Sequence, residues 1–271
     1  MHAALLIAAV LQSQHVAWAP SIEVAKTYSQ KTGKPVLIVN RAALGSGPPR
    51  VFGDKRLAEL NKYFICVIAY TVEAARPVYE IPAKWRNVNI FLVEPDGKLI
   101  GRMGGLYLPW DMVDSAKQCL WARSAESLLA KRLRQYPAEG NSLAKMSMVC
   151  SVKGRLQEAE DWLNRAANEY TSPDLLRRAY ITLGDQLRVE QRFGEAVNPL
   201  LRAAALARGD DQTYEARLRL AANYLRLRQF DKAESEAQAC FDLKGISNEE
   251  KTISQNQLSR IRSSREQPFV K

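Results

Sequence analysis

Three stretches of this sequence begin in the same way: Leu156-Gln157-Glu158-Ala159, Phe193-Gly194-Glu195-Ala196 and Phe230-Asp231-Lys232-Ala233. Each begins with a large apolar residue, has Ala three positions later, and starts 37 residues from the next. Two equal spacings in succession indicate an internal repeat rather than a coincidence of composition. The repeated block runs from about Asn141 to Leu243 and decides the architecture of the second half of the chain.

Other sets of positions that lie 37 residues apart, which we call columns, support this alignment, because each column keeps one size of side chain. Large apolar columns hold Met146, Leu183 and Leu220, and Cys150, Leu187 and Tyr224; small columns hold Ser147, Gly184 and Ala221, and Ala166, Ala203 and Cys240. Small residues are needed where two helices cross closely. Residues 141–271 are therefore predicted to form three helical hairpins followed by a capping helix at Asn248 to Arg262.

The block resembles tetratricopeptide repeats, whose paired helices stack into a solenoid. That family has a period of about 34 residues, so a 37-residue spacing predicts turns between repeats that are about three residues longer, as at Gly209-Asp210-Asp211. The resemblance also implies a groove, lined by the first helix of each pair, that holds a peptide or a helix of another protein. Carried over by position, the groove residues are Asn141, Ala144, Met148, Ser151, Arg178, Ile181, Asp185, Arg188, Glu215, Leu218, Ala222 and Leu225.

The composition of this predicted groove favours an amphipathic segment as its ligand, because it mixes arginines with Met148, Ile181 and Leu225. Some members of the family grip a terminal carboxylate with Lys and Asn. Ala144 and Met148 stand where that clamp would start, so a terminal carboxylate is not the expected ligand. The alternative is that some of these residues pack against the neighbouring domain.

Residues 14–122 alternate between helical and strand patterns. The expected elements are a helix capped by Ser21 and closed by Gly33, strands at Val36 to Val39, Phe64 to Tyr70, Asn89 to Val93 and Lys98 to Arg102, a loop at Arg41 to Arg50, a helix at Asp54 to Lys62, a tight turn at Asp96-Gly97 and a helix from about Pro109. The helical pattern continues to Gln135 with a break expected near Trp121. Residues 123–140 are read as a connecting helix and linker.

This first part resembles exported domains of the thioredoxin fold. Trp18, Ala25-Lys26 and Gly33-Lys34-Pro35 stand where that family has a Trp, an Ala-Lys pair and a Gly-Lys-Pro ahead of the first central strand. Phe52-Gly53-Asp54 resembles the helix after the active-site loop, and the stretch from Phe91 to Lys98 resembles the terminal hairpin. The expected fold class is therefore an α/β thioredoxin-like domain followed by an all-α repeat domain.

Two departures predict that this domain has no redox activity. The family's chemistry needs a Cys-x-x-Cys pair after the first central strand, and that place holds Ala42 to Gly47 without a thiol. The family also has a cis-proline before the penultimate strand, and Val88 stands there. A cis bond before a residue other than proline costs roughly 2.5–4 kcal/mol, so a trans peptide is expected.

Other kinds of chemistry also lack the residues they need. The only histidines are His2 and His15, which leaves no Ser-His-Asp triad and no histidine-based metal site. Gly45-Ser46-Gly47 lacks the Gly-Lys-Ser/Thr of a phosphate-binding loop. No catalytic residue, metal or cofactor is predicted. The net charge of +10 is spread evenly, at +5 before and +5 after Ala122, so nucleic acid is not the expected partner.

The chain starts with an apolar run, Ala3 to Leu11, of the length found in signal peptides. Residues 1–13 are therefore predicted to be a signal peptide, although no Lys or Arg precedes the run; a buried first helix is the alternative. Export to the periplasm or the cell exterior follows from this reading, and a cytoplasmic location from the alternative. No other stretch has 18 apolar residues and no cysteine follows the run, so no stable membrane anchor is expected.

The four cysteines Cys66, Cys119, Cys150 and Cys240 lie far apart and form no Cys-x-x-Cys pair. They are read as small buried apolar residues. A disulfide such as Cys119–Cys150 stays open for an exported protein, because sequence alone cannot assign it.

These observations favour a non-catalytic adaptor that binds another protein through its helical repeats. Two alternatives remain at this point. One is a divergent thiol oxidoreductase or thioredoxin-like folding factor that uses Cys66 or Cys119. The other is a scaffold that associates with itself through the helical stack.

Overall fold

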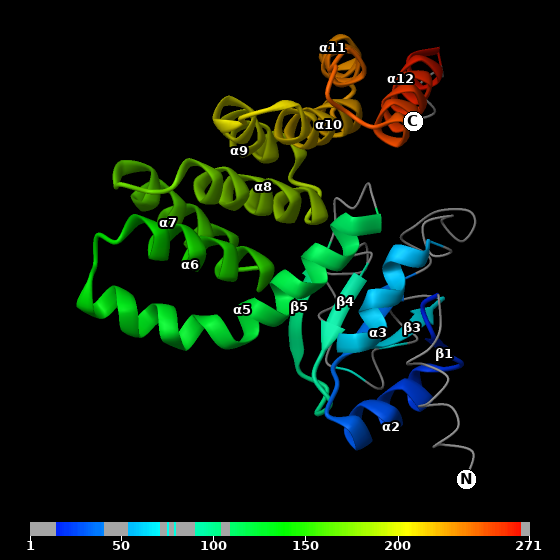
Figure 1. The fold of residues 1–271 in the computed structure, drawn as a ribbon, viewed down its shortest axis with the longest axis vertical. Coiled ribbons are helices and arrows are strands. Elements are labelled where there is room, and N and C mark those ends of the chain that lie inside the picture. Colours follow the sequence, from blue (N-terminus) through cyan, green and yellow to red (C-terminus); the bar gives the residue numbers. More distant parts are fainter. Residues whose placement is uncertain are drawn as a thin grey trace. The chain divides into compact units, whose positions relative to one another are not determined.

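The structure, a computed structural model, describes residues 15–40, 54–70, 75, 79, 90–103 and 109–266. The chain divides into two compact units. One comprises Met1–Ser127 with Val152–Gly154, and the other Leu128–Ser151 with Arg155–Lys271. The first unit contains a small mixed sheet with helices, and the second is helical (Figure 1). The prediction of an α/β part followed by an all-α part is confirmed at this level.

A five-stranded mixed sheet, in the order β1-β3-β2-β4-β5, organises the first unit. β1 and β2 run parallel to β3, whereas β4 is antiparallel to β2 and β5 is antiparallel to β4. The strands are β1 Trp18–Ala19, β2 Val36–Asn40, β3 Ile65–Ala69, β4 Ile90–Val93 and β5 Leu99–Met103. The four predicted strands are confirmed to within one residue at each end, and β1 was not predicted.

The central strand β2 is buried along its whole length. Val36, Leu37 and Val39 have no exposed surface, so both faces of this strand are covered. A strand covered on both faces needs a continuous apolar run instead of an alternating one. This is why Val36 to Val39 is readable as a buried strand from the sequence.

The first helix of this unit, α2 (Ile22–Thr32), has the predicted caps. The Ser21 hydroxyl accepts a hydrogen bond from the backbone N–H of Val24 at 3.2 Å. Gly33 adopts φ 71°, a conformation that favours glycine, and its N–H donates to the Ser29 carbonyl at 2.8 Å. The predicted helix at Asp54 to Lys62 begins instead as a 3-10 helix, η3 (Lys55–Glu59), and continues as α3 (Leu60–Tyr63).

The hairpin between β4 and β5 has a longer turn than the predicted Asp96-Gly97 pair. The Gly97 N–H donates to the Glu94 carbonyl at 2.9 Å, and the Glu94 N–H donates to the Lys98 carbonyl at 2.7 Å. Three residues therefore separate the closing pair, with Gly97 at φ 94°. Gly97 forms a bulge after the turn, which is the usual role of glycine in three-residue hairpin loops.

Helix α5 (Pro109–Gln135) is continuous, so the predicted break near Trp121 is wrong. No Gly or Pro lies between Met112 and Gln135 to interrupt its hydrogen bonds. Ala122 and Ala125 are buried directly after the expected break. The boundary between the two units falls within this helix, after Ser127.

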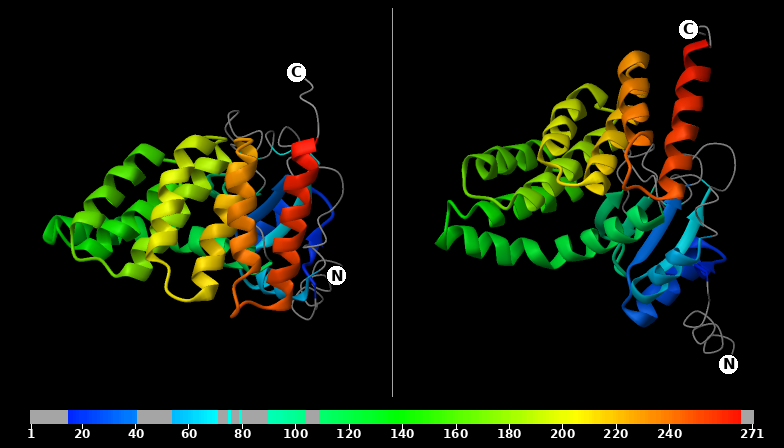
Figure 2. Two further views of the ribbon diagram at one scale, coloured as in Figure 1. Left: turned by 90° about the horizontal axis from the view of Figure 1, so that it is seen from above. Right: turned by 45° about the horizontal axis from the view of Figure 1, so that its top comes forward.

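The second unit is a stack of helices that follow one another in chain order (Figures 1 and 2). Packing contacts join α7 to α8, α8 to α9, α9 to α10, α10 to α11 and α11 to α12. The helices are α6 Gly140–Val152, α7 Leu156–Asn168, α8 Pro173–Val189, α9 Phe193–Leu206, α10 Asp210–Arg226, α11 Phe230–Phe241 and α12 Asn248–Glu266. We call α6, α8 and α10 the first helices and α7, α9 and α11 the second helices of the three pairs.

The turns inside the pairs repeat the 37-residue period at the level of single backbone groups. The second helices start at Leu156, Phe193 and Phe230. The residue two positions earlier has positive φ in each turn: 76° at Gly154, 62° at Gln191 and 57° at Arg228. The N–H before each second helix donates at 2.9 Å to the carbonyl of the residue five positions earlier. The predicted repeat is therefore a structural repeat.

These turns predict a gain in stability from Gln191→Gly. Left-handed φ costs an L-residue roughly 1–2 kcal/mol, and the extra backbone entropy of glycine offsets about half of this. We expect the free energy of unfolding, measured with urea, to rise by about 0.5–1 kcal/mol, and Gly154→Ala to lower it by about 1 kcal/mol. Gln229, with φ −85°, provides the control. An equal gain in Gln229→Gly would contradict this account of the turn.

The extra length of the repeat lies in the helices and not, as predicted, in longer turns between repeats. α8 and α10 have 17 residues each. Only Ala207 to Gly209 separate α9 from α10, and Asp210 and Asp211 already belong to the first turn of α10. Acidic residues stabilise a helix N-terminus by interaction with the helix dipole. A pair of aspartates after a glycine therefore marks the helix start.

Most predicted core columns are confirmed by burial, but in the column of Leu156, Phe193 and Phe230 the two phenylalanines are partly exposed. The small columns at Ala159, Ala196 and Ala233 and at Ala166, Ala203 and Cys240 have no exposed surface. A Cβ atom added at Gly184 would lie 2.8 Å from both Cγ and Cδ2 of Leu200, so α8 and α9 approach closely there. The predicted capping helix is α12, which starts at Asn248 as expected. In the described parts of the chain, no helix combines the length and the apolar character that crossing a membrane requires.

Candidate interaction site on the first helices of the repeats

The residues of the predicted groove all lie on the first helices, but most are withdrawn from water. Seven are buried: Ala144, Met148, Ser151, Ile181, Leu218, Ala222 and Leu225. Asn141 and Arg178 are exposed, and Asp185, Arg188 and Glu215 are partly exposed. The expectation that Met148, Ile181 and Leu225 offer an open apolar surface is therefore not met. The accessible part of this face is polar.

Asn141 has a structural contact between repeats. Its side-chain Oδ1 accepts a hydrogen bond from the backbone N–H of Ser172 at 2.9 Å. Ser172 immediately precedes α8, so this contact joins the start of the first pair to the start of the second. Asn141 therefore links neighbouring helices through its side-chain oxygen.

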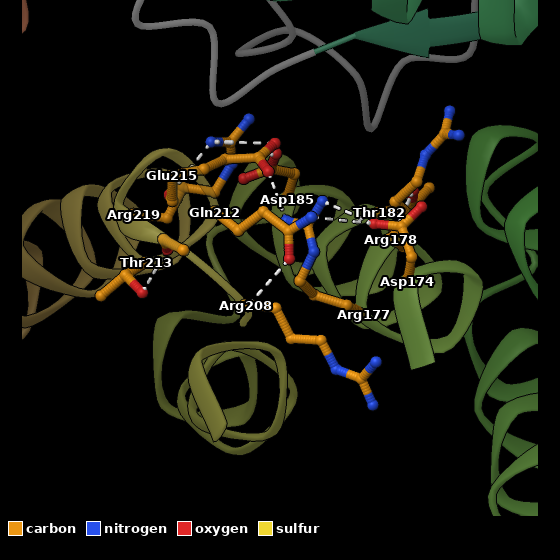
Figure 3. A network of polar contacts seen from close by, with 11 residues as sticks. Asp174, Arg177, Arg178, Thr182, Asp185, Arg208, Gln212, Thr213, Glu215 and Arg219 are labelled. Carbon is orange, nitrogen blue, oxygen red and sulfur yellow. Dashed lines mark hydrogen bonds and ion pairs between the residues drawn. The ribbon is translucent and has the colours of Figure 1, made fainter. Parts of the chain in front are cut away.

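Three of the predicted residues belong to a network of ion pairs that joins α8 to α10 (Figure 3). We call the six residues Asp174, Arg177, Asp185, Arg188, Glu215 and Arg219 the charged network. The nitrogen–oxygen distances are 3.2 Å for Arg177–Asp174, 2.5 Å for Arg177–Glu215, 3.6 Å for Arg219–Glu215, 2.8 Å for Arg219–Asp185 and 3.1 Å for Arg188–Asp185.

The arginines and Asp185 of the network are largely shielded from water, whereas the Asp174 side chain is 55% exposed. The side chains of Arg177 and Arg219 are 7% exposed, and that of Asp185 is 13% exposed. Ions withdrawn from water need opposite charges to offset the loss of hydration. Three arginines face three carboxylates here, so the network is neutral as a whole. Arg219 also donates to the Glu215 carbonyl at 3.2 Å, which further fixes its side chain.

Arg178 differs from the network residues beside it, because it is exposed. In Figure 3 its guanidinium points away from the network. Its backbone carbonyl accepts a hydrogen bond from the Thr182 hydroxyl at 2.8 Å, while its side chain forms no ion pair with the described residues. Arg178 is therefore the predicted groove residue whose charge is available to a partner.

Sequence reasoning missed Asp174, Arg177 and Arg219, although part of the signal was present. Asp174 and Arg177 are three residues apart and Glu215 and Arg219 four apart, the spacings that bring side chains together on one helix. The pairs between helices had no such signal. Arg177 and Glu215 are 38 residues apart, and Asp185 and Arg219 are 34 apart. Neither separation equals the 37-residue period of the repeat.

The four cysteines are buried, as predicted, and none of them forms a disulfide in the described structure, so Cys119 is not joined to Cys150. Burial raises the pKa of the Cys66, Cys119 and Cys240 thiols to about 12. The thiolate is the reactive form of cysteine. Cys66 and Cys119 therefore lack both the access and the ionisation that thiol–disulfide exchange requires.

We expect the thiols of the folded protein to be inert to an aromatic disulfide reagent at pH 8 and all to react after denaturation. The raised pKa values also set a pH dependence. The unfolded thiols ionise near pH 9, before the folded ones, so the free energy of unfolding should fall as the pH rises from about 9 towards 12. Rapid labelling of one thiol under native conditions would contradict this prediction.

Several predicted features fall outside the described residues. These are the signal sequence at 1–13, the loop from Arg41 to Arg50 with Ala42 to Gly47, and the peptide bond at Val88. Among the residues that are described, no cluster of His, Cys, Asp and Glu has the arrangement of a metal site. The predicted absence of a metal or cofactor stays a prediction.

The geometry defines a class of protein in which a small mixed α/β sheet precedes a stack of paired helices. No protein-family model matches the chain, and comparisons with curated proteins and with solved structures likewise give no match.

Proposed function

We propose that this protein is a non-catalytic adaptor whose helical repeats bind a segment of another protein. In this proposal the first unit is a thioredoxin-like domain without its redox pair, and the second unit is a set of tetratricopeptide-like repeats. The strand order β1-β3-β2-β4-β5 and the capped helix α2 support the first assignment. The 37-residue recurrence of helix starts and left-handed turns supports the second.

The observation that carries the proposal is the pairing of a fixed charged network with an accessible arginine. The network joins two successive first helices, α8 and α10, through buried arginines. Side chains held in this way lose little further entropy when a partner binds. Arg178 lies beside them on α8 with its guanidinium open to water. The proposed binding face therefore centres on Arg178, and Asp185, Arg188 and Glu215 shape its surroundings.

A photo-crosslinking amino acid at position 178 tests this proposal in the native cell. The same amino acid at position 260, an exposed arginine on α12, provides the matched control. We expect one protein to be captured at position 178 and not at position 260. With that protein purified, Arg178→Glu should weaken binding at least tenfold, whereas Arg260→Glu should leave it unchanged. Equal capture at both positions, or equal binding by both variants, would refute the proposed face.

The two alternatives find less support in the structure. The oxidoreductase reading needs an accessible low-pKa thiol, whereas Cys66 and Cys119 are buried with raised pKa values. The scaffold reading needs an apolar surface at an end of the stack. The terminal helix α12 has three buried residues, Ser254, Leu258 and Ile261, and one partly exposed apolar residue, Ile253, while its other residues are polar, as expected of a cap. Sedimentation over a range of concentrations distinguishes a monomer from a self-assembling scaffold.

We also propose that the protein is exported, on the basis of the apolar run from Ala3 to Leu11. Replacing Leu6 by Arg interrupts this run, and signal-peptide recognition depends on its apolar character. The variant should remain inside the cell when its distribution is compared by cell fractionation. An unchanged distribution would favour the alternative of a first helix that stays with the protein.

A further inference from the structure

Aromatic and arginine side chains gather at the α5–α6 and α7–α8 connections, away from the charged network in sequence. We call Arg132, Tyr136, Trp162, Arg165 and Tyr170 the aromatic edge. All five belong to the helical unit. Arg132 lies in the last turn of α5, Tyr136 follows that helix, and Tyr170 lies in the connection before α8. Trp162 and Arg165 are on α7.

The aromatic edge is held together by stacking and hydrogen bonds. The guanidinium of Arg132 lies over the Tyr136 ring at 4.6 Å, and that of Arg165 lies over the Trp162 ring at 4.7 Å. Arg165 also donates from Nη2 to the Pro137 carbonyl at 3.0 Å, which joins α7 to the α5–α6 turn. A Cβ atom added at Gly140 would lie 2.4 Å from the Tyr170 carbonyl oxygen, so the two connections touch.

The two tyrosines of the aromatic edge are exposed, whereas Trp162 is partly buried. Tyr170 is 95% exposed and Tyr136 is 54% exposed. Trp, Tyr and Arg are the residues that contribute most to binding at protein interfaces. Tyr136 also borders a shallow, open depression of about 410 Å³. The depression is lined by Arg132, Gln135, Tyr136, Pro137, Ala138 and Glu139.

The charge around this edge is positive. Glu139 accepts two hydrogen bonds from Arg132, at 2.6 and 2.7 Å, so these two charges offset each other. Lys131, Arg134 and Arg165 are exposed and form no ion pair with any residue that the structure describes. Asp161 and Glu169, each four residues from Arg165, are the exposed carboxylates nearest to it in sequence. Three available cations against these two carboxylates leave an excess of positive charge, which favours an acidic ligand.

We propose that the aromatic edge binds an extended acidic segment of another protein that contains proline. Proline-rich segments are extended before binding and dock on aromatic surfaces, because little entropy is lost when they are held. The ring of Tyr136 beside Pro137 offers such a surface, and the flanking cations attract acidic residues on either side of a proline. This surface is separate from the face centred on Arg178, and the inference does not depend on that assignment.

A fluorescent peptide of alternating Glu and Pro, twelve residues long, tests the inference by anisotropy with the full-length protein. We expect saturable binding that weakens with salt, and no binding of the same peptide with Lys in place of Glu. Tyr136→Ala and Arg165→Ala should each weaken binding at least tenfold. Tyr170→Ala adds a variant that cannot disturb packing, because its side chain is almost fully exposed. Arg260→Ala, another exposed arginine of the helical unit, should bind as the unmodified protein does.

Several outcomes would overturn the inference. They are no saturable binding below 1 mM peptide, binding that is lost equally in Arg260→Ala, and tighter binding of a single-stranded oligouridylate than of the peptide. The last result would assign the edge to nucleic acid, which arginine and aromatic side chains also bind by stacking. Circular dichroism melting of each variant separates loss of binding from loss of fold. None of these results bears on the crosslinking experiment at position 178.

Discussion

Replacing Asp185 by Ala is expected to destabilise the helical unit by about 3 kcal/mol or more. The Asp185 carboxylate faces Arg219 at 2.8 Å and Arg188 at 3.1 Å, and the arginine side chains are 7% and 11% exposed. Removing one member of a buried ion pair typically costs about 3–5 kcal/mol, because the remaining charge has neither a partner nor water. Arg219 keeps its contact with Glu215, which places the expected effect near the lower end of this range.

The measurement is the unfolding transition of the helical unit, followed by calorimetry or by urea titration of helical circular dichroism. Asp161→Ala is the matched control. Asp161 is exposed on α7, and its carboxylate accepts one hydrogen bond, from Gln157 at 3.3 Å. Exposed substitutions of this kind change stability by about 0.5 kcal/mol or less. A loss below about 1 kcal/mol in Asp185→Ala would mean that the network stabilises the stack far less than its burial implies.

Replacing Gly184 by Val is expected to destabilise the same unit by about 3 kcal/mol, at the upper end of the usual cost of overpacking. The first added carbon would lie 2.8 Å from two carbon atoms of Leu200, where α8 crosses α9. Real Cβ atoms essentially never approach another atom this closely, so the helices must move apart or Leu200 must change rotamer. Both responses disturb a core in which Leu200 has no exposed surface.

A double-mutant cycle identifies the cause of this loss. Leu200→Ala alone should cost about 2–5 kcal/mol, since it leaves a cavity. In the double variant the valine occupies part of that cavity. The double variant should therefore lose less stability than the sum of the two single losses, by about 1 kcal/mol or more. Gly194→Val is the matched control, because no atom lies within 4 Å of a Cβ added there. Strict additivity, or an equal loss in Gly194→Val, would rule out the proposed clash.

The backbone architecture was predictable because local sequence signals and the fold agree. Val36 to Val39 reads as a buried strand since a strand covered on both faces carries apolar residues throughout. Ser21 and Gly33 mark the ends of a helix through the hydrogen bonds that their chemistry permits. The repeat is even easier to recognise in the sequence, because helices that cross closely need small residues at fixed positions. β1, with two residues, is too short to leave such a pattern.

The candidate site was predictable only in part. Family resemblance places Arg178, Asp185 and Glu215 on the first helices, where they lie, but it does not say which side chains remain open to water. Met148 and Leu225 are buried although their positions suggested a surface. Ion pairing between helices depends on the crossing geometry of α8 and α10, and the 34- and 38-residue separations of the paired residues carry no periodic signal. The aromatic edge also escaped prediction, because its residues come from α5, α7 and two connections and lie outside the repeated columns.

The arrangement of the helical unit also has a consequence for how it folds. Among the described residues, the main packing contacts from α7 to α12 join helices that follow one another in the chain, together with α8 to α10 and α10 to α12. Such contacts close short loops, and chains of low contact order fold quickly for that reason. Each hairpin can form as soon as its own residues are available and then serve as a template for the next. Order should be lost first at the ends of the stack, so hydrogen exchange should be slowest in α8, α9 and α10.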